Sequence, residues 1–379
     1  MKALLSYARL RQAEMIRLIR ALVECESPSD DARAVSRFVE LVADTLAPLG
    51  RVRRIPGGKH GPHLLCEFNL PGSRSEGRLL LLGHSDTVWP VGTLARMPFR
   101  EAEGRLWGPG VLDMKAGLAL AVFAVRALRE MERPVRRQVA LQLNSDEEVG
   151  SPSSRSLTEE QARRSVAVLV LEPGTGLEGK LKTARKGVGD YTLVVRGKAA
   201  HAGADFSAGS SAILELARQI EKIAGFTRLD RGITVNPGLI SGGSRANVVA
   251  AEAYAEIDVR VVRLKDAEAL DRKFRRLRPV DKRCTLEISG GLNRPPMERS
   301  PGGQRLFRLA RKLAAELGVR LEESLSGGGS DGNFTAALGV PTLDGLGAVG
   351  EGMHAPEESV LLDRLADRTA LLAGLLQAV

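Results

Sequence analysis

Two histidines and five carboxylates follow apolar segments or lie in Gly/Pro-rich turns of this sequence. They are His84, Asp86, Asp113, Glu147, Glu148, Glu172 and His354. Imidazole and carboxylate ligands without sulfur suit Zn(II), with Mn(II) or Co(II) as substitutes. Two divalent ions would offset the repulsion among these acids, and ions about 3.5–4 Å apart polarise a carbonyl and lower the pKa of a water between them. The pattern therefore predicts a two-metal hydrolytic site, with one carboxylate left to act as a base.

His84 follows four leucines, 79–82, and Gly83. Such a run is typical of a strand buried on both faces, and ligands bind at the carboxyl ends of strands in open α/β sheets. Asp86 is two residues further on and projects to the same side in extended backbone, where it can fix the imidazole tautomer. Taken alone, His84 could equally be a strand-end histidine that is hydrogen-bonded to a neighbour.

Asp113 ends a turn that contains Gly108-Pro109-Gly110 and precedes an apolar helix at 118–131. Its alternative role is that of a helix N-cap. Glu147 and Glu148 follow a predicted strand over 138–144, and a solvated acidic turn is the alternative there. Adjacent strand residues point to opposite faces, so both glutamates can face one site only if the strand has already ended.

The order of the predicted elements indicates an α/β fold. Apolar strands that alternate with helices, each strand followed by a polar residue, predict a mixed, mostly parallel sheet flanked by helices. Near residue 187 the pattern changes to strand–helix–strand–strand–helix–strand, which predicts an inserted α+β, ferredoxin-like unit. The predicted domains are 1–186 and 298–379, which form one catalytic domain, and 187–297, the insert. Residues 1–24 predict one amphipathic helix, and 319–321 a short strand.

Composition excludes several other classes of protein. The 379 residues are 43% hydrophobic and 27% charged, with a net charge of +9, and the basic residues are spread along the chain. Aromatic residues make up only 4%, which argues against nucleic-acid binding. Cys25, Cys66 and Cys284 form no CxxC motif, and no apolar run is long enough for a signal peptide or a membrane span. We therefore expect a cytoplasmic protein with no membrane partner.

Five motifs in order resemble the dinuclear zinc amidohydrolases, a family that includes carboxypeptidase G, acetylornithine deacetylase, succinyl-diaminopimelate desuccinylase and aminoacylase. The motifs lie at 83–88, 108–117, 146–151, 171–173 and 353–354, so that the resemblance covers essentially the whole chain. The carboxypeptidase G branch is the most similar, because 84–88 is followed by Pro98-Phe99 and the 108–110 turn.

The resemblance implies a role for each residue of the predicted site. His84 and Glu172 would hold one zinc ion, Glu148 and His354 the other, and Asp113 would bridge the two. A cis peptide would join Asp113 to Met114. Asp86 would brace His84, and Glu147 would be the general base that takes a proton from the water and returns it to the leaving amine.

The resemblance also implies that the insert is a lid and a homodimerisation domain. His201 would stabilise the oxyanion in a neighbouring active site, although it could instead be a surface-loop histidine. Asn247 and Arg260 would hold substrate oxygens, and Arg294 is a further candidate for a substrate carboxylate. Gly328 and Gly329 could present backbone N–H groups to an anion, or they could simply form a turn.

The implied function is hydrolysis of the amide between an acyl group and an amino acid with a free carboxylate, as in a glutamate carboxypeptidase. Deacylation of N-acetyl- or N-succinyl-diamino acids and cleavage of di- or tripeptides are alternatives, because specificity pockets cannot be inferred from motif spacing. A non-catalytic homologue that binds metal or amino acids is a third alternative.

Overall fold

The computed structural model describes residues 1–72 and 77–379, which form two compact units. The first unit comprises Met1–Ala184, Arg299–Ser326 and Ser330–Val379. The second comprises Arg185–Glu298, where we predicted 187–297, and also includes Gly327–Gly329. Within the described ranges, no helix is both long and apolar enough to cross a membrane.

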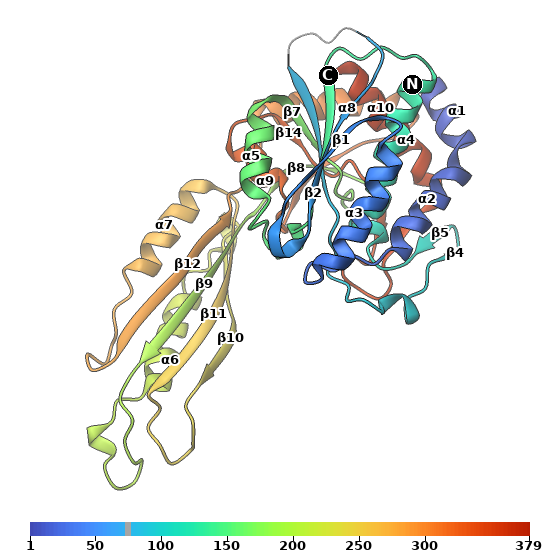
Figure 1. Ribbon diagram of the computed structural model, residues 1–379. Coiled ribbons are helices and arrows are strands. Elements are labelled where there is room, and N and C mark those ends of the chain that lie inside the picture. The colour runs from blue at the N-terminus through green and yellow to red at the C-terminus, as the bar shows by residue number, and fades with distance from the viewer. Residues whose placement is uncertain (73–76) are drawn as a thin grey trace. The chain divides into compact units, whose positions relative to one another are not determined.

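A six-stranded sheet organises the first unit (Figure 1). In spatial order its strands are β1 (Gly50–Ile55), β2 (His63–Phe68), β6 (Gln138–Asn144), β3 (Arg78–His84), β7 (Ser165–Val170) and β14 (Thr342–Leu343). Strands β6, β3, β7 and β14 run parallel, and β1 and β2 are antiparallel at one edge. This is the predicted mixed, mostly parallel sheet.

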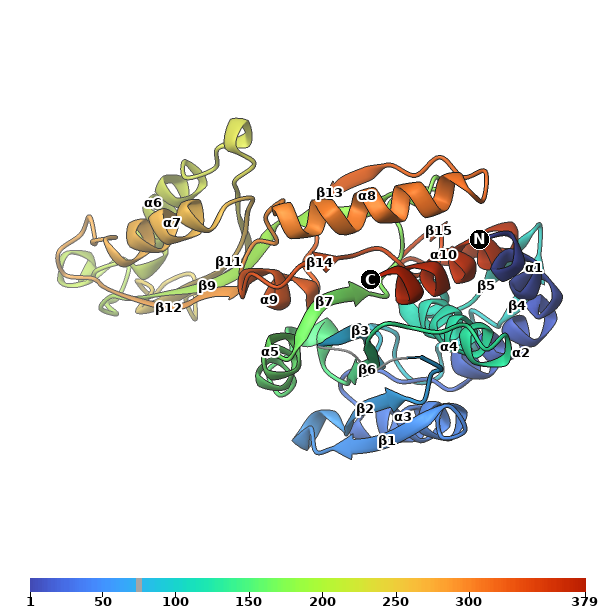
Figure 2. The ribbon, with the colours of Figure 1, turned by 90° about the horizontal axis from the view of Figure 1, so that it is seen from above.

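The leucine run of β3 is explained by burial on both faces of the sheet. Leu79 and Leu81 belong to the main core, whereas Leu80 and Leu82 belong to a smaller core on the other face. Helices α4 (Ala116–Glu130) and α10 (Leu365–Ala378) contribute to the main core, and α5 (Arg155–Arg163) covers the opposite face (Figure 2). A strand segment between two helical layers must be apolar on both of its faces, as residues 79–82 of β3 are.

The other elements of the first unit complete its layers. The helices are α1 (Lys2–Leu10), α2 (Gln12–Glu24), α3 (Ala32–Leu46), α8 (Pro301–Ala315) and α9 (Gly332–Ala337). One small sheet contains β4 (Arg100–Ala102), β5 (Arg105–Trp107), β15 (Gly350–Glu351) and β16 (Ser359–Leu361), and another contains β8 (Leu181–Arg185) and β13 (Glu323–Ser326).

Two local predictions are wrong. The single helix predicted for 1–24 is divided at Arg11, where φ is −94° and ψ is 8°. The strand predicted for 319–321 is absent, and β13 begins only at Glu323. The N–H of Val319 instead donates to the carbonyl of Ala314, 3.0 Å away, and so completes the C-terminal turn of α8.

The second unit has the strand order of a ferredoxin-like fold. Its elements are β9 (Gly187–Arg196), α6 (Ala212–Ala224), β10 (Thr234–Gly242), β11 (Glu252–Val261), α7 (Leu264–Arg275) and β12 (Thr285–Arg294). The strands pair antiparallel in the order β10-β11-β9-β12. Helices α6 and α7 lie on the same face of this sheet (Figure 2), and β11 accordingly alternates between buried and exposed residues.

Candidate metal centre

Three neighbouring parallel strands bring the candidate ligands to one edge of the sheet. His84 is the last residue of β3 and pairs with Asn144, the last residue of β6. Strand β6 has therefore ended before Glu147 and Glu148, which lie in a short 3-10 turn. This meets the condition under which both glutamates can face one site. Glu172 lies two residues after the end of β7.

Asp113 and His354 come from two loops. Asp113 lies in the irregular segment Val111–Lys115, with φ of −114° and ψ of 93°, and a cis peptide joins it to Met114. The cis peptide that the resemblance implied is thus confirmed. The helix N-cap alternative for Asp113 is wrong, because Lys115 occupies that position in α4. His354 lies between β15 and β16, with a φ of 62°.

These five residues form two clusters that share Asp113. His84, Asp113 and Glu172 make one cluster, and Asp113, Glu148 and His354 make the other; within each, the ligand atoms lie within 4.8 Å of one another. Asp113 Oδ1 is 3.1 Å from His84 Nε2, and its Oδ2 is 3.2 Å from His354 Nε2. Glu172 Oε1 is 3.5 Å from His84 Nε2, and Glu148 Oε1 is 3.5 Å from His354 Nε2. Each oxygen of Asp113 therefore belongs to a different cluster.

The electrostatics of the clusters suit cations. Burial opposes charge on Asp113, but hydrogen bonds to His354 and His84 more than offset it and hold the pKa of Asp113 well below its usual range. The carboxylates of Asp113 and Glu148 raise the pKa of His354 to about 10. The pKa of Glu148 is raised to about 7, mainly because this carboxyl group is buried. Buried Glu148 Oε1 accepts no hydrogen bond from the described residues, so it fits a metal ligand better than a structural carboxylate.

Asp86 joins neither cluster but contacts residues of both. The Nδ1 of His84 is 2.9 Å from the main-chain oxygen of Asp86 and 3.5 Å from its carboxylate. In a neutral imidazole, donation from Nδ1 would give Nε2, which faces Asp113 and Glu172, a lone pair for a metal ion. The Asp86 carboxylate also accepts the backbone N–H groups of Glu147 and Glu148, at 3.1 Å each.

Two buried charged side chains, Glu358 and Arg185, are not among the predicted site residues. Glu358, 1% exposed, accepts backbone N–H groups from the segment that carries Asp113. In the second unit Arg185, 3% exposed, donates to the carbonyls of Gly328 and Gly329, at 3.2 and 3.1 Å. Both act on main-chain groups distant in sequence, and no local pattern marks such contacts.

The structure brings His201 and Asn247 together in the second unit. Val248 pairs with His201, and the N–H of Ala202 donates to the carbonyl of Asn247, 3.0 Å away. The Nδ1 of His201 accepts the N–H groups of Gly203 and Ala204, at 3.1 and 3.0 Å. This neutral tautomer carries its proton on Nε2, where it can be donated to an oxyanion.

Arg260 and Arg294 lie at the other end of the same sheet, because both pair with Val188. The Arg260 guanidinium donates to Asp258, with Nη2 2.8 Å from Oδ2. Glu252 pairs with Arg196, the last residue of β9 before the segment that carries His201. Eight residues of strand separate Glu252 from Arg260, which is about 25 Å. One insert therefore cannot place both His201 and Arg260 against the same small molecule.

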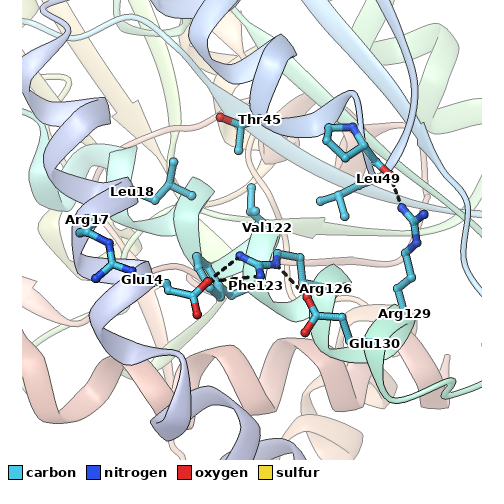
Figure 3. A pocket seen from close by; sticks show the side chains of 11 residues that line it. Glu14, Arg17, Leu18, Thr45, Leu49, Val122, Phe123, Arg126, Arg129 and Glu130 are labelled. Carbon is cyan, nitrogen blue, oxygen red and sulfur yellow. Dashed lines mark hydrogen bonds and ion pairs between the residues drawn. The ribbon is translucent and has the colours of Figure 1, made fainter.

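A hollow of about 590 Å³ lies elsewhere in the first unit, between α2, α3 and α4 (Figure 3). Leu18, Leu49, Val122 and Phe123 are among its lining residues. Its carboxylates, Glu14 and Glu130, are paired with arginines. It includes no histidine and none of the candidate site residues, so its chemistry differs from that of the two clusters.

The α/β fold and the two clusters define the class of a metal-dependent hydrolase of amide or peptide bonds. A family model described as Peptidase family M20/M25/M40 matches residues 80–378. The chain belongs to this family.

Two curated relatives span most of the chain. Carboxypeptidase G2 of Pseudomonas sp. (strain RS-16) is 28% identical over 96% of this chain and 89% of its own. Succinyl-diaminopimelate desuccinylase of Acidovorax ebreus is 30% identical over 86% of this chain and 88% of its own.

Solved structures share the fold. Aminopeptidase PepT of Bacillus cereus superimposes with a TM-score of 0.80 at 23% identity, covering 97% of this chain and 98% of its own. The Bacillus subtilis YXEP protein, described as a dinuclear metal binding peptidase from the M20 family, superimposes with a TM-score of 0.70 at 15% identity, covering 97% of this chain and 98% of its own.

Proposed function

We propose that this chain hydrolyses the amide bond between an acyl group and an amino acid with a free carboxylate, in the manner of a glutamate carboxypeptidase. The observation that carries the proposal is the shared position of Asp113, one oxygen in each of two ligand clusters. The similarity to carboxypeptidase G2 over 96% of the chain supports this branch of the family.

The proposed cofactor is a pair of zinc ions. His84 and Glu172 would hold the first ion, Glu148 and His354 the second, and Asp113 both. The nitrogen and oxygen ligands suit Zn(II), and Co(II) or Mn(II) can substitute for it. When bound, the ions would polarise the scissile carbonyl and lower the pKa of a water. The dinuclear description of the YXEP structure, which shares the fold, is consistent with two ions.

Glu147 is the proposed general base. It belongs to neither ligand cluster, yet it is adjacent to Glu148 in the same turn, and its backbone N–H is anchored on Asp86. Its carboxylate would take a proton from the attacking water and then give it to the departing amine. Asp86 would position this turn and His84 rather than touch the substrate.

A homodimer through the second unit would supply the oxyanion donor, the Nε2–H of His201, together with Asn247. Large apolar side chains are exposed on edge strand β10 and on α6: Leu239 and Ile240 are 60% and 62% exposed, and Leu214 is 56% exposed. An edge strand with such residues is suited to pairing with a second copy. Within one insert, the end of the sheet near His201 is about 25 Å, or about eight residues of strand, from Arg260. This spacing supports donation by His201 to a neighbouring active site.

The substrate carboxylate is the proposed ligand of the arginines at the other end of the insert. Arg260 and Arg294 offer guanidinium groups, and Gly328 and Gly329 offer backbone N–H groups. Because the Arg260 guanidinium is paired with Asp258, a substrate carboxylate would compete with the Asp258 carboxylate for this guanidinium. Arg185, which holds the carbonyls of both glycines, would keep this loop in place.

A second candidate is N-acyl-diamino-acid deacylation, which the 30% identity to a succinyl-diaminopimelate desuccinylase favours. Turnover of acyl-glutamates, acetylornithine, succinyl-diaminopimelate, neutral N-acyl amino acids and small peptides by zinc-loaded protein separates the candidates. Turnover confined to acyl-glutamates is the expected result. Turnover confined to a diamino acid would replace the proposal with the deacylase, and turnover confined to peptides would replace it with a di- or tripeptidase.

We also infer a reducing, cytoplasmic location. All three cysteines, Cys25, Cys66 and Cys284, are free, and two of them are buried. Free buried thiols are typical of proteins that fold where disulfides are not maintained. Fractionation of the native host would test this inference.

A further inference from the structure

One buried carboxylate, that of Glu358, accepts hydrogen bonds from two chain segments. One segment contains the candidate ligand Asp113, and the other follows the candidate ligand His84. The Oε1 of Glu358 accepts the backbone N–H groups of Leu112 and Asp113, at 2.8 and 3.1 Å. Its Oε2 accepts the N–H of Gly110 and the indole Nε1–H of Trp89, both at 2.8 Å. All four donors lie far from it in sequence, so these contacts form only in the folded chain.

Strand pairing explains how Glu358 reaches this position. Strand β16 pairs antiparallel with β5, with Ser359 opposite Trp107. Glu358 therefore lies opposite Gly108, whose N–H donates to the Glu358 carbonyl, 3.3 Å away. The side chain can then reach the segment that follows, which carries Asp113. In the other direction, Glu358 is four residues from His354.

The donors around Glu358 require a carboxylate. Its two oxygens offer about four acceptor sites and no proton, and four N–H groups occupy them. A glutamine would keep one acceptor oxygen but would turn an NH₂ group toward N–H donors. Unpaired backbone N–H groups in a buried segment are costly, so the segment would shift to find other partners.

Asp113 is the residue that such a shift would affect most. Its N–H is held by Glu358, while its two carboxylate oxygens are directed at His84 and His354. That split orientation needs a fixed backbone at Asp113. We propose that Glu358 is a positioning residue that orients Asp113 to serve both metal ions and ties it to the loop that carries His354. The inference rests on the proposed metal centre.

Calorimetric titration of zinc into protein that has been freed of metal with a chelator tests this role. Glu358→Gln should bind zinc about 10–100-fold more weakly than wild type, and both ions should be affected because Asp113 is shared. Glu358→Asp, which keeps the charge, should recover part of the affinity. The absorption spectrum of the Co(II)-loaded protein should also change in Glu358→Gln, because the ligand geometry changes. A general loss of packing would not require such a change.

Glu357→Gln is the matched control, since it makes the same chemical change one residue earlier at an exposed position. It should bind zinc as wild type does. A folded Glu358→Gln protein that binds two zinc ions with wild-type affinity would overturn the inference. If wild type itself binds no pair of ions, the proposed function fails instead, so the two failures are distinguishable.

Trp89→Phe settles the question if Glu358→Gln does not fold. It removes the indole donor to Oε2 together with part of the ring system, and leaves the carboxylate and its three backbone partners in place. The loosened carboxylate should weaken zinc binding by about threefold, in line with the loss of one hydrogen bond. Zinc affinity equal to wild type in this variant would then contradict the positioning role.

Discussion

The carboxylate of Asp86 accepts the backbone N–H of Glu148 at 3.1 Å, and so links the end of β3 to the turn after β6. The same carboxylate accepts the N–H of Glu147, also at 3.1 Å. His84 contacts the main-chain oxygen of Asp86 through Nδ1. One residue therefore positions a proposed ligand from each cluster and the proposed base, through its main-chain oxygen and its carboxylate.

Replacing Asp86 by asparagine should reduce both zinc affinity and kcat by about 10–100-fold. The asparagine oxygen can accept one of the two backbone N–H groups, but its NH₂ group cannot accept the other. Ser29→Ala is the control, since it removes only a hydroxyl that donates to Asp86 Oδ2 at 2.7 Å. That variant should keep most of its activity. Zinc titration and steady-state kinetics measure both effects, and wild-type values for Asp86→Asn would refute the linking role.

Glu147 and Glu148 are adjacent but should respond differently to the same substitution. Glu147→Gln should keep two zinc ions and lose about 10²–10⁴-fold in kcat, because a general base is removed. Glu148→Gln should instead lower the zinc affinity of one ion. Metal analysis and kinetics on both variants separate these outcomes, and near-normal kcat in Glu147→Gln would show that another group is the base.

His201→Ala should be inactive alone and partly active when it is mixed with Glu147→Gln. If the insert acts across a symmetric dimer, each mixed dimer has one site with an intact base and an intact histidine. Random exchange of subunits would then restore about a quarter of wild-type turnover. A mixture that stays inactive while subunits exchange would place His201 in its own chain's site or outside any site.

Glu215 should make the stability of the second unit depend on pH. Its buried side chain accepts the N–H groups of Val280 and Asp281, at 2.9 Å each. Burial alone would raise the pKa of Glu215, but these N–H groups and Gln219 lower it overall. A folded pKa below the unfolded value of about 4.3 gives stability that is present above that value and is lost as pH falls through the folded pKa.

Glu215→Gln should therefore destabilise the protein by about 1–3 kcal/mol at neutral pH and flatten the acid limb of its stability curve. Urea unfolding between neutral pH and the acid range measures both effects. Glu221→Gln, at an exposed position of the same helix, should leave the curve unchanged. An unchanged acid limb in Glu215→Gln would contradict the assigned contacts.

Sequence patterns were sufficient where function coincides with the end of an apolar strand. The leucine run before His84 and the strands before Glu148 and Glu172 predicted both the parallel sheet and the edge at which these residues join the two clusters. Asp113 and His354 lie in loops, where Gly/Pro-rich turns marked them as candidates and only the motif resemblance implied their roles. The structure then placed an oxygen of Asp113 in each cluster.

Contacts with distant backbone groups could not be predicted from the sequence. Glu358 was not among the predicted site residues, and only the pairing of β16 with β5 brings it to the segment that carries Asp113. The resemblance implied that Arg260 holds substrate oxygens, but it did not indicate that Asp258, two residues away on the same strand, pairs with this guanidinium. Side-chain rotamers and strand register decide both contacts.

The most direct test of the two-ion centre is a zinc titration of protein that has been freed of metal with a chelator. Bound metal and hydrolysis of an acyl-glutamate are followed together. We expect no turnover after chelation and full recovery only when two ions are bound per chain. In Asp113→Asn, both ions should lose their tight binding. Turnover that survives chelation, or an Asp113→Asn protein that binds two ions as tightly as wild type, would contradict the two-ion centre.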